Sequence, residues 1–374
     1  MWVGNPHDGG ALRAVLLEVV DRAVEEHRQG FGRHILVELH DDGAVAVTDE
    51  GRGMPTEVRD GRPMAEQIMA SWRAERVDGN RYPSGPCVAS TLSERCRLET
   101  WSEGQAWEQT YERGVPVTPF AAVDATTRTG TRITYWPDLT IFTTVTRLTP
   151  AMIQPRLREI AALCPGLRIE LRHAGETVVE HRPTGISSLV AEACPGGLLP
   201  TVARFTGEDM ALPPVGHFIG GPPPRGTGGP IRVEVALQWR AAVPPEVDEA
   251  RAHEDDLDED TRPGSVYLLN EHRFHSGTPV RGLHAGLLQA VRRLARERGL
   301  LPRRGWTELA ATITRRAVVA MRLEHPCPTF GTRCRDTPVN PDAGALLRQL
   351  TAARVYARLV EHPDALARLL APGG

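Results

Sequence analysis

Residues 11–55 combine two patterns that restrict the fold more than any other part of the chain. Hydrophobic residues recur at three- and four-residue spacing over 11–29, which predicts an amphipathic helix that ends near Gly30. Two short hydrophobic segments follow at 35–39 and 44–47, and the residues Asp41-Asp42-Gly43 between them are typical of a hairpin turn. A helix with one apolar face beside a hairpin indicates a mixed α/β fold.

The rest of the chain predicts the same mixed architecture in two domains. Glycine- and proline-rich segments appear from about residue 183, so we place the boundary between domains 1–185 and 186–374. Further strands are expected at 95–101, 106–112, 131–136, 167–172 and 231–239. Helices are expected at 153–164, at 280–298 and from about Asp342 to the C terminus, and an acidic loop at 246–260.

Charge and composition exclude few classes of protein but carry one chemical consequence. The formal net charge is -3, which gives no global attraction to nucleic acid. The chain contains no lysine, so its 44 basic side chains other than His are all Arg. Any site that needs a cation must therefore use the planar guanidinium group, which does not replace an ammonium group in geometry.

Cysteine spacing and hydropathy point to a reducing compartment. None of the six cysteines forms a CxxC pair or has His partners at zinc spacing, so we expect free thiols and no metal site. No signal peptide and no apolar segment of membrane-spanning length is evident. We therefore expect a cytoplasmic protein without a membrane partner.

Several motifs occur in the order found in one ATPase family. They include LEVVDRAVEE (17–26), VAVTDEGRGMP (45–55), TRTGTRITYWPD (127–138), VEVALQW (233–239) and GTPVRGL (277–283). This collinear set resembles the GHKL ATPase region of the DNA gyrase B subunit and of topoisomerase IV, in a diverged form. The resemblance implies a Bergerat-type α/β sandwich, followed by a transducer domain of ribosomal-S5-like fold with a left-handed β-α-β crossover.

The resemblance implies that the adenine end of a nucleotide pocket is kept. Asp49 matches the Asp that accepts from the adenine amino group, and Thr131 matches the Thr that supports it. Gly53 would let the backbone approach the base, since it has no Cβ atom. Arg52 is expected to pair with Glu26 as a wall of the pocket. The remaining expected lining residues are Pro55, Ile68 and Met69.

The motif that carries catalysis in the family is only half retained. Glu18 matches the Glu that activates the water attacking the γ-phosphate. Four residues later, Arg22 replaces an Asn that helps to hold magnesium, and a cation cannot ligate a cation. We therefore expect that this chain does not form the usual magnesium site. Two alternatives remain for Glu18: it forms an ion pair with Arg22, four residues later on the same helix, or it remains catalytic.

The phosphate end departs furthest from the family. Residues 80–90 stand where the family has a glycine-rich lid whose backbone amides cradle the triphosphate, and Pro86 has no N–H group. Arg76 is aligned with a lid Lys, and Glu108 with an Arg near the ribose. Arg333 or Arg335 is expected to replace the Lys of the transducer's Q-T-K loop as a charge.

These departures leave three functional hypotheses open. The first is a pseudo-ATPase that binds ATP, ADP, another adenine-like ligand or a gyrase-type partner. The second is a functional ATP-hydrolysing subunit of a topoisomerase-like assembly. The third is an enzyme of another class that reuses the emptied pocket, in biosynthesis or drug resistance.

The expected partners follow from charge and from the start of the chain. A basic segment, 281–316, would contact DNA or would be a solvated helix face. Its arginines are Arg281, Arg292, Arg293, Arg296, Arg298, Arg303, Arg304, Arg315 and Arg316. The chain starts at Met1-Trp2-Val3-Gly4, where the family has an arm that wraps the partner protomer, so we expect a monomer or a nucleotide-independent dimer.

Overall fold

The computed structural model describes residues 5–70, 85–212, 229–243, 264–270, 272–302, 304–332 and 336–371. The chain divides into two compact units, residues 1–185 and 186–374, and each is described by itself. None of the helices in these ranges has the length and apolar character needed to cross a bilayer. The five cysteines in these ranges form no disulfide. The acidic stretch 246–260 and the lid residues 80–84 lie outside the described residues.

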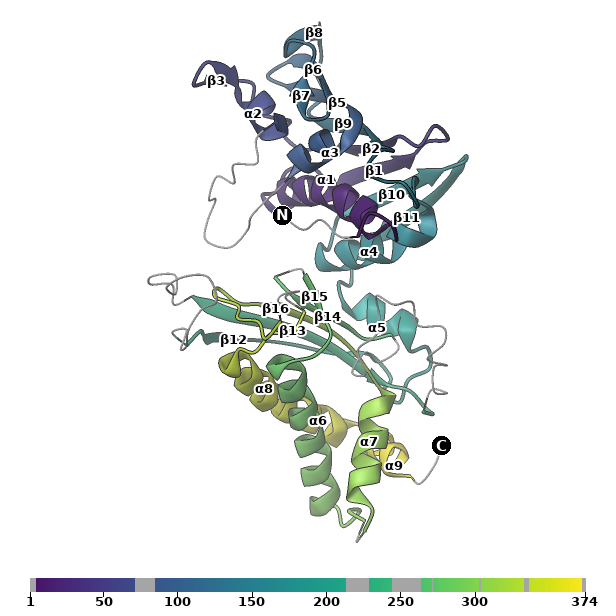
Figure 1. Cartoon of the computed structure of the whole chain (residues 1–374). Coiled ribbons are helices and arrows are strands. Elements are labelled where there is room, and N and C mark those ends of the chain that lie inside the picture. The colour runs from purple at the N-terminus through teal and green to yellow at the C-terminus, as the bar shows by residue number, and fades with distance from the viewer. Residues whose placement is uncertain are drawn as a thin grey trace. The chain divides into compact units, whose positions relative to one another are not determined.

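The first unit is built on a nine-stranded sheet (Figure 1). Its order is β11-β10-β1-β2-β9-β5-β6-β7, and β8 also pairs with β6. Within this sheet, β1 and β10 are the one parallel pair among the described strands, and the other pairs are antiparallel. The strands are β1 (His34–Leu39), β2 (Val45–Asp49), β5 (Ser93–Ser102), β6 (Gln105–Glu112), β7 (Val115–Pro116), β8 (Ala121–Ala125), β9 (Gly130–Pro137), β10 (Arg168–His173) and β11 (Glu176–His181).

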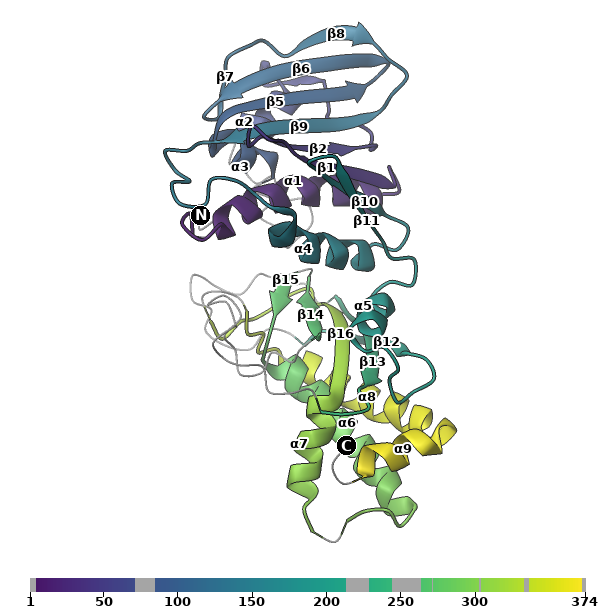
Figure 2. The ribbon, with the colours of Figure 1, turned by 90° about the vertical axis from the view of Figure 1, so that its right-hand side faces the viewer.

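Helices cover one face of this sheet (Figures 1 and 2). The longest, α1 (Gly10–Arg28), buries the apolar stripe that the sequence predicted, from Leu12 to Val24. It is joined on this face by α3 (Pro86–Thr91) and α4 (Pro150–Leu163). A small hairpin, β3 (Val58–Arg59) and β4 (Arg62–Pro63), leads into α2 (Met64–Ala70), which packs against α3.

The second unit has a five-stranded sheet of order β12-β13-β16-β14-β15. The adjacent strands β14 and β16 are parallel, and a parallel pair needs a crossover connection, which α6 and α7 supply. The elements are α5 (Ser187–Ala193), β12 (Ala203–Met210), β13 (Pro230–Trp239), β14 (Val266–Leu269), β15 (His272–Phe274), α6 (Thr278–Glu297), α7 (Trp306–Arg316), β16 (Ala317–Glu324), α8 (Pro341–Glu361) and α9 (Pro363–Leu370).

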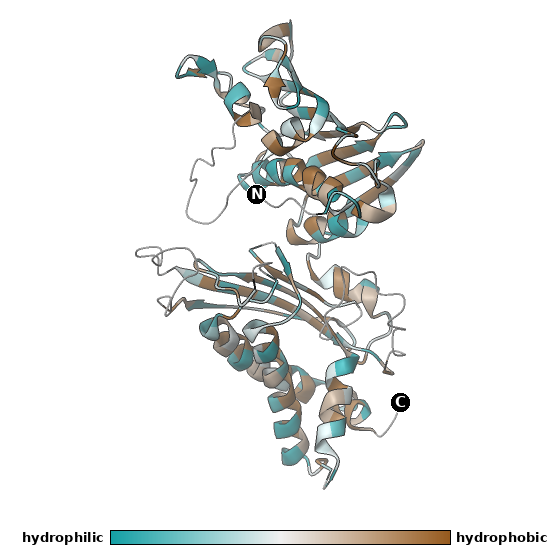
Figure 3. Ribbon diagram, in the orientation of Figure 1, coloured by the Kyte–Doolittle hydropathy of each residue, from teal (hydrophilic) through white to brown (hydrophobic). Residues whose placement is uncertain are grey.

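Both faces of the second sheet are covered in its centre. Residues 231, 233, 235 and 237 of β13 share one core with α6 and α8, whereas Ala236 and Gln238 are buried on the other face, where α5 packs. Figure 3 shows hydrophobic residues along these strands and on the helix sides turned toward them. The expected single last helix is wrong: it breaks at His362, because Pro363 restricts the preceding residue and has no N–H to donate.

Candidate functional site

The candidate site lies where β2 ends, at Asp49. Three strands place Asp49, Thr131 and Thr100 side by side, because Asp49 of β2 is paired with Thr131 of β9, and Thr131 with Thr100 of β5. All three side chains are buried. The Asp49 carboxylate accepts a hydrogen bond from the backbone N–H of Gly51 at 2.8 Å. The sheet therefore holds a single carboxylate in a nearly dry site.

Burial has a large effect on the charge state of Asp49. Loss of hydration raises the pKa of this carboxyl to about 6, although the amide of Gly51 and the positive charge of Arg22 both lower it. The neighbouring charge of Glu26 raises it further. Asp49 is therefore ionised at neutral pH, which makes its carboxylate a stronger acceptor, and it becomes neutral in mildly acidic solution.

Sequence reasoning missed Thr100. Its hydroxyl donates to the backbone oxygen of Gly130 at 3.1 Å and accepts from the backbone N–H of Met54 at 2.7 Å, with the Thr131 hydroxyl at 3.5 Å. It thus ties the loop after β2 to the start of β9. No motif in the sequence marks Thr100, because its role arises only when the three strands pair.

Gly53 is required here by a close contact within the chain. Its φ is +88°, and a Cβ atom at this position would lie 2.5 Å from the backbone oxygen of Trp101 and 3.0 Å from the Thr100 hydroxyl. The close approach shown here is to β5 of the same chain, and the expected approach to a bound base stays a prediction. Glycine is needed so that the loop can pack on the edge of the sheet.

Arg52 and Glu26 form the ion pair that the resemblance implied. Glu26 is buried and accepts from the Arg52 backbone N–H at 3.1 Å, from Nε at 3.0 Å and from Nη2 at 3.1 Å. Burial raises the pKa of Glu26, but hydrogen bonds from Arg52 and the charges of Arg22 and Arg52 outweigh it and leave the pKa below its usual value. Arg52 also lies 4.2 Å over the ring of Phe31.

Arg22 departs from the ion pair that helical spacing favoured. Its Nη2 atom lies 3.9 Å from Oε1 of Glu26, which follows Arg22 by one turn of α1, whereas Glu18 precedes Arg22 by one turn. The expected pair of Glu18 and Arg22 is therefore replaced by a contact with a buried carboxylate. Arg22 is attracted more strongly to Glu26 and Asp49 than to Glu18, because Glu26 and Asp49 are buried and water screens their charges less.

Glu18 reaches the beginning of α3 instead. Its Oε2 atom accepts a hydrogen bond from the backbone N–H of Gly85 at 2.9 Å. The next residue, Pro86, has no N–H group, so this first turn offers a ligand fewer donors than a glycine-rich one. The thiol of Cys87 follows, and burial, aided by the charge of Glu18, raises its pKa to about 11. Cys87 therefore stays protonated at neutral pH.

The other expected lining residues fall into three groups. Pro55 and Ile68 are half-buried near the loop and on α2, where a ligand could contact them. Met69 is 0% exposed, so it supports the wall from within instead of lining it. Arg76 lies outside the described residues. Glu108, expected near a ribose, is paired with Arg97 across β5 and β6 at 2.8 Å.

The residues present do not fit a bound magnesium ion. Arg22 stands at the position of the family's metal-holding Asn, and a guanidinium group offers no lone pair and repels a divalent cation. Among the described residues, no group of three or more His, Cys, Asp or Glu side chains could hold a metal ion. The loss of the magnesium site stays a prediction, and it rests on the guanidinium group of Arg22.

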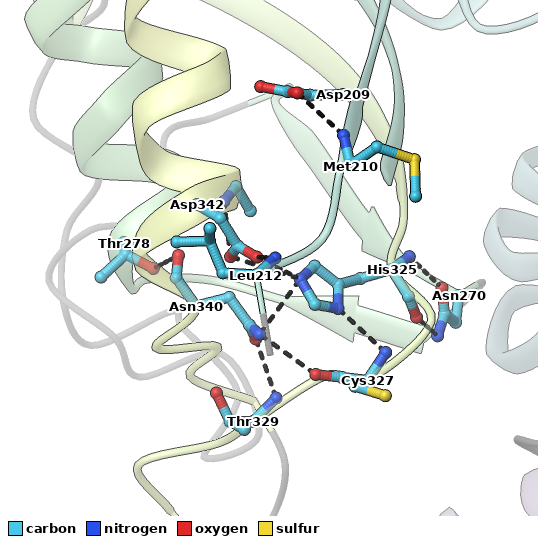
Figure 4. Close-up of polar contacts among 11 residues, drawn as sticks. Asp209, Met210, Leu212, Asn270, Thr278, His325, Cys327, Thr329, Asn340 and Asp342 are labelled. Carbon is cyan, nitrogen blue, oxygen red and sulfur yellow. Dashed lines mark hydrogen bonds and ion pairs between the residues drawn. The ribbon is translucent and has the colours of Figure 1, made fainter. Parts of the chain in front are cut away.

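In the second unit, a buried polar network anchors the segment between β16 and α8 (Figure 4). The segment is held at Thr329 by Asn340, whose Oδ1 accepts from the Thr329 N–H at 2.8 Å, and whose Nδ2 donates to the Cys327 oxygen at 3.1 Å. His325 lies 3.3 Å from both oxygens of Asp342. Arg333 and Arg335, the expected phosphate-facing charges, lie outside the described residues, so their place in this segment is not described.

The basic segment 281–316 is less uniform than the sequence indicated. Arg316 is 2% exposed and donates to the backbone oxygens of Arg240, Ala241 and Arg368, so it is a structural residue and cannot contact DNA. Its pKa is lowered by burial and by the charge of Arg368. The described arginines that remain exposed are Arg281, Arg292, Arg293, Arg296, Arg298, Arg304 and Arg315.

Comparison with known proteins places this geometry in context. The chain is 26% identical over 388 residues to the DNA gyrase B subunit of Halalkalibacterium halodurans, an alignment that covers 100% of this chain and 55% of the relative. It is 36% identical over 180 residues to the gyrase B subunit of Thermotoga maritima, covering 46% of this chain and 28% of the relative. The chain thus spans about half the length of the curated relatives that it matches over its whole length. No protein-family model matches the chain.

The fold has counterparts among solved structures. The 43K ATPase domain of Thermus thermophilus gyrase B, in complex with an aminocoumarin, superposes with a TM-score of 0.72 at 24% identity over 99% of this chain and 91% of that one. The topoisomerase IV ATP-binding domain of Francisella tularensis gives a TM-score of 0.66 at 18% identity, over 95% of this chain and 89% of that one. The resemblance drawn from the motifs is confirmed, and the fold is that of a GHKL domain followed by a transducer.

Proposed function

We propose that this gyrase-B-like chain binds an adenine-type ligand and does not turn over magnesium ATP. One observation carries the proposal. The carboxylate that would bind the base, Asp49, is held in a buried site, whereas the guanidinium group of Arg22 lies where the metal ligand would be. Asp49 is buried beside Thr131 and Thr100, and its carboxylate is fixed by the Gly51 amide. A single ionised acceptor in a dry site favours a planar ligand that offers an amino group.

Two further contacts support the loss of turnover. Glu18, the residue that would activate water, already accepts the Gly85 amide, which lies at the start of the helix that would face phosphates. Arg22 lies beside Glu26 and keeps a divalent cation away from the same helix face. Without the metal, and with the Gly85 amide already used by Glu18, the described residues of the site do not stabilise the charge that develops on a transferred phosphoryl group.

Calorimetry tests the binding half of the proposal. Adenosine is expected to bind the intact chain, and Asp49→Asn is expected to weaken it by about tenfold or more, because an amide replaces the ionised acceptor. Asp124→Asn is the matched control, since Asp124 is an exposed acid on β8 whose carboxylate also accepts a backbone amide, from Ala125 at 2.8 Å. If adenosine does not bind, or if Asp49→Asn binds it equally well, the proposal that the chain binds an adenine-type ligand through Asp49 is wrong.

A second candidate function is an ATP-hydrolysing subunit that works with a gyrase-type partner. Similarity to gyrase B subunits along the whole chain and the presence of a carboxylate at Glu18 favour it. Phosphate release from magnesium ATP separates the two. We expect no release above the background of the buffer; a clear rate that disappears in Glu18→Gln would favour the second candidate.

A further inference from the structure

Arg22 is a charged group of the site whose hydrogen-bonding capacity its described neighbours do not fully use. It lies on the face of α1 that also carries Glu18 and Glu26, at intervals of one helical turn. Its Nη2 atom is 3.9 Å from Glu26, which is close enough for an ion pair but too long for a hydrogen bond. Glu26 is already bound through three hydrogen bonds from Arg52.

One donor of Arg22 is unsatisfied, and the Arg22 side chain as a whole is 24% exposed, so a ligand can reach it. Its Nε atom is buried and has no hydrogen-bond partner among the described residues. An orphaned donor of a charged group is unfavourable by more than an ordinary unmade hydrogen bond, so the site gains when an acceptor arrives there. Guanidinium groups prefer anionic oxygens that can accept two parallel bonds, as in a phosphate or a carboxylate.

We propose that Arg22 takes the place of the divalent cation, so that the site binds a nucleoside monophosphate without metal. This inference rests on the adenine-type ligand proposed above and names its acidic group. Asp49 would read the base, and the guanidinium group of Arg22 would donate to the single phosphate as a fixed counter-charge. The protein then supplies from its own chain the charge that a metal ion supplies elsewhere.

Length selection follows from the groups around Arg22. The carboxylate of Glu18 takes the Gly85 amide and repels additional anionic groups, and Pro86 adds no donor. The other charged groups on this side are Glu26, Asp49 and Arg52. A second or third phosphate would therefore meet the negative charge of Glu18 at a first turn of α3 where the Gly85 amide is already used and Pro86 offers none.

The test uses AMP, adenosine and ATP as probes of the intact chain, by calorimetry in EDTA and again in magnesium. AMP is expected to bind at least about tenfold tighter than adenosine in both buffers, which corresponds to one charge-assisted pair. ATP is expected to bind no tighter than AMP. Equal affinities for AMP and adenosine in the unchanged chain, or a clear tightening of AMP or ATP by magnesium, would overturn the inference.

Variants separate this inference from the proposal on which it rests. Arg22→Gln is expected to lose the preference for AMP over adenosine when both are measured at about pH 8.5, where Asp49 stays ionised without the charge of Arg22, and its binding of adenosine shows that the variant is folded. Arg28→Gln, on the same helix beside Glu25, is expected to change neither affinity. If adenosine binds through Asp49 but AMP is no better, only this inference fails. If adenosine does not bind at all, the proposed function fails with it.

Discussion

Asp49 shows how one buried residue sets the chemistry of a site. Its carboxylate receives an amide hydrogen bond from Gly51 and lies among hydroxyl groups, but burial still holds its pKa at about 6. A folded pKa above the unfolded one means that the proton stabilises the fold. That stability is present below the unfolded value near 3.8 and is lost as the pH rises through about 6.

Ligand binding should respond to pH in the opposite sense. The amino group of adenosine needs the ionised carboxylate, so affinity is expected to be constant above about pH 7 and to fall by about tenfold per pH unit below pH 6. Calorimetry between pH 5 and pH 8 measures this. In Asp49→Asn, the affinity should not depend on pH. If the unchanged protein and Asp49→Asn show the same dependence of affinity on pH, a group other than Asp49 contacts the amino group of the ligand.

Gly53 permits a second test at a single position. Gly53→Ala places a Cβ atom 2.5 Å from the Trp101 oxygen, so we expect a loss of stability clearly above the ~1–2 kcal/mol that a left-handed φ alone imposes. Gly104→Ala is the matched control, because its φ is +79° and a Cβ atom there meets nothing within 4 Å. Urea unfolding measures both. Equal losses would show that the loop moves away from β5 at no cost.

At the scale of elements, His325 joins the end of β16 to the beginning of α8. Its Nδ1 accepts from the Cys327 backbone N–H at 3.0 Å, so the proton of the neutral ring lies on Nε2, which faces Asp342. Burial lowers the pKa of His325, and the charge of Asp342 only partly reverses this. The neutral ring is therefore the form that the fold selects.

Acid should loosen this junction. Because the folded pKa is lowered, the stability that the neutral ring provides is present above the unfolded value near 6.5 and is lost as the pH falls below it, by at most about 1.4 kcal/mol per pH unit. Unfolding by urea at pH 7.5, 6.5 and 5.5 measures the loss. His325→Gln should remove this part of the slope, whereas His40→Gln, an exposed histidine, should not.

At the scale of the whole molecule, nucleotide is not expected to drive association. A ligand shifts an equilibrium only by its different affinity for the two states, and the described start of α3 gives a triphosphate few donors. We expect the same elution volume in size-exclusion chromatography with and without a non-hydrolysable ATP analogue. A shift to a larger species would count against the proposed function and favour the ATP-hydrolysing alternative.

The amino-acid sequence alone determined most elements whose pattern is local. The amphipathic stripe of α1, the hairpin of β1 and β2, and the strands β5, β6 and β9 lie within a few residues of their predicted ranges, because each repeats with one period. Strand β16 (Ala317–Glu324) was not predicted, because a strand that is buried on both faces shows no alternation of hydrophobic and polar residues. The order of the motifs indicated the GHKL-plus-transducer fold, which the periodicity of hydrophobic residues cannot identify.

Only the tertiary structure decided which distant groups meet. Pairing of β2, β9 and β5 places Thr100 beside Asp49, burial directs Arg22 to Glu26 instead of Glu18, and three backbone oxygens enclose Arg316. Each outcome depends on solvent exclusion and on contacts between residues far apart in the chain. Sequence spacing fixes which side chains share a helix face or a strand face, but the strength of a charge depends on the water that packing removes.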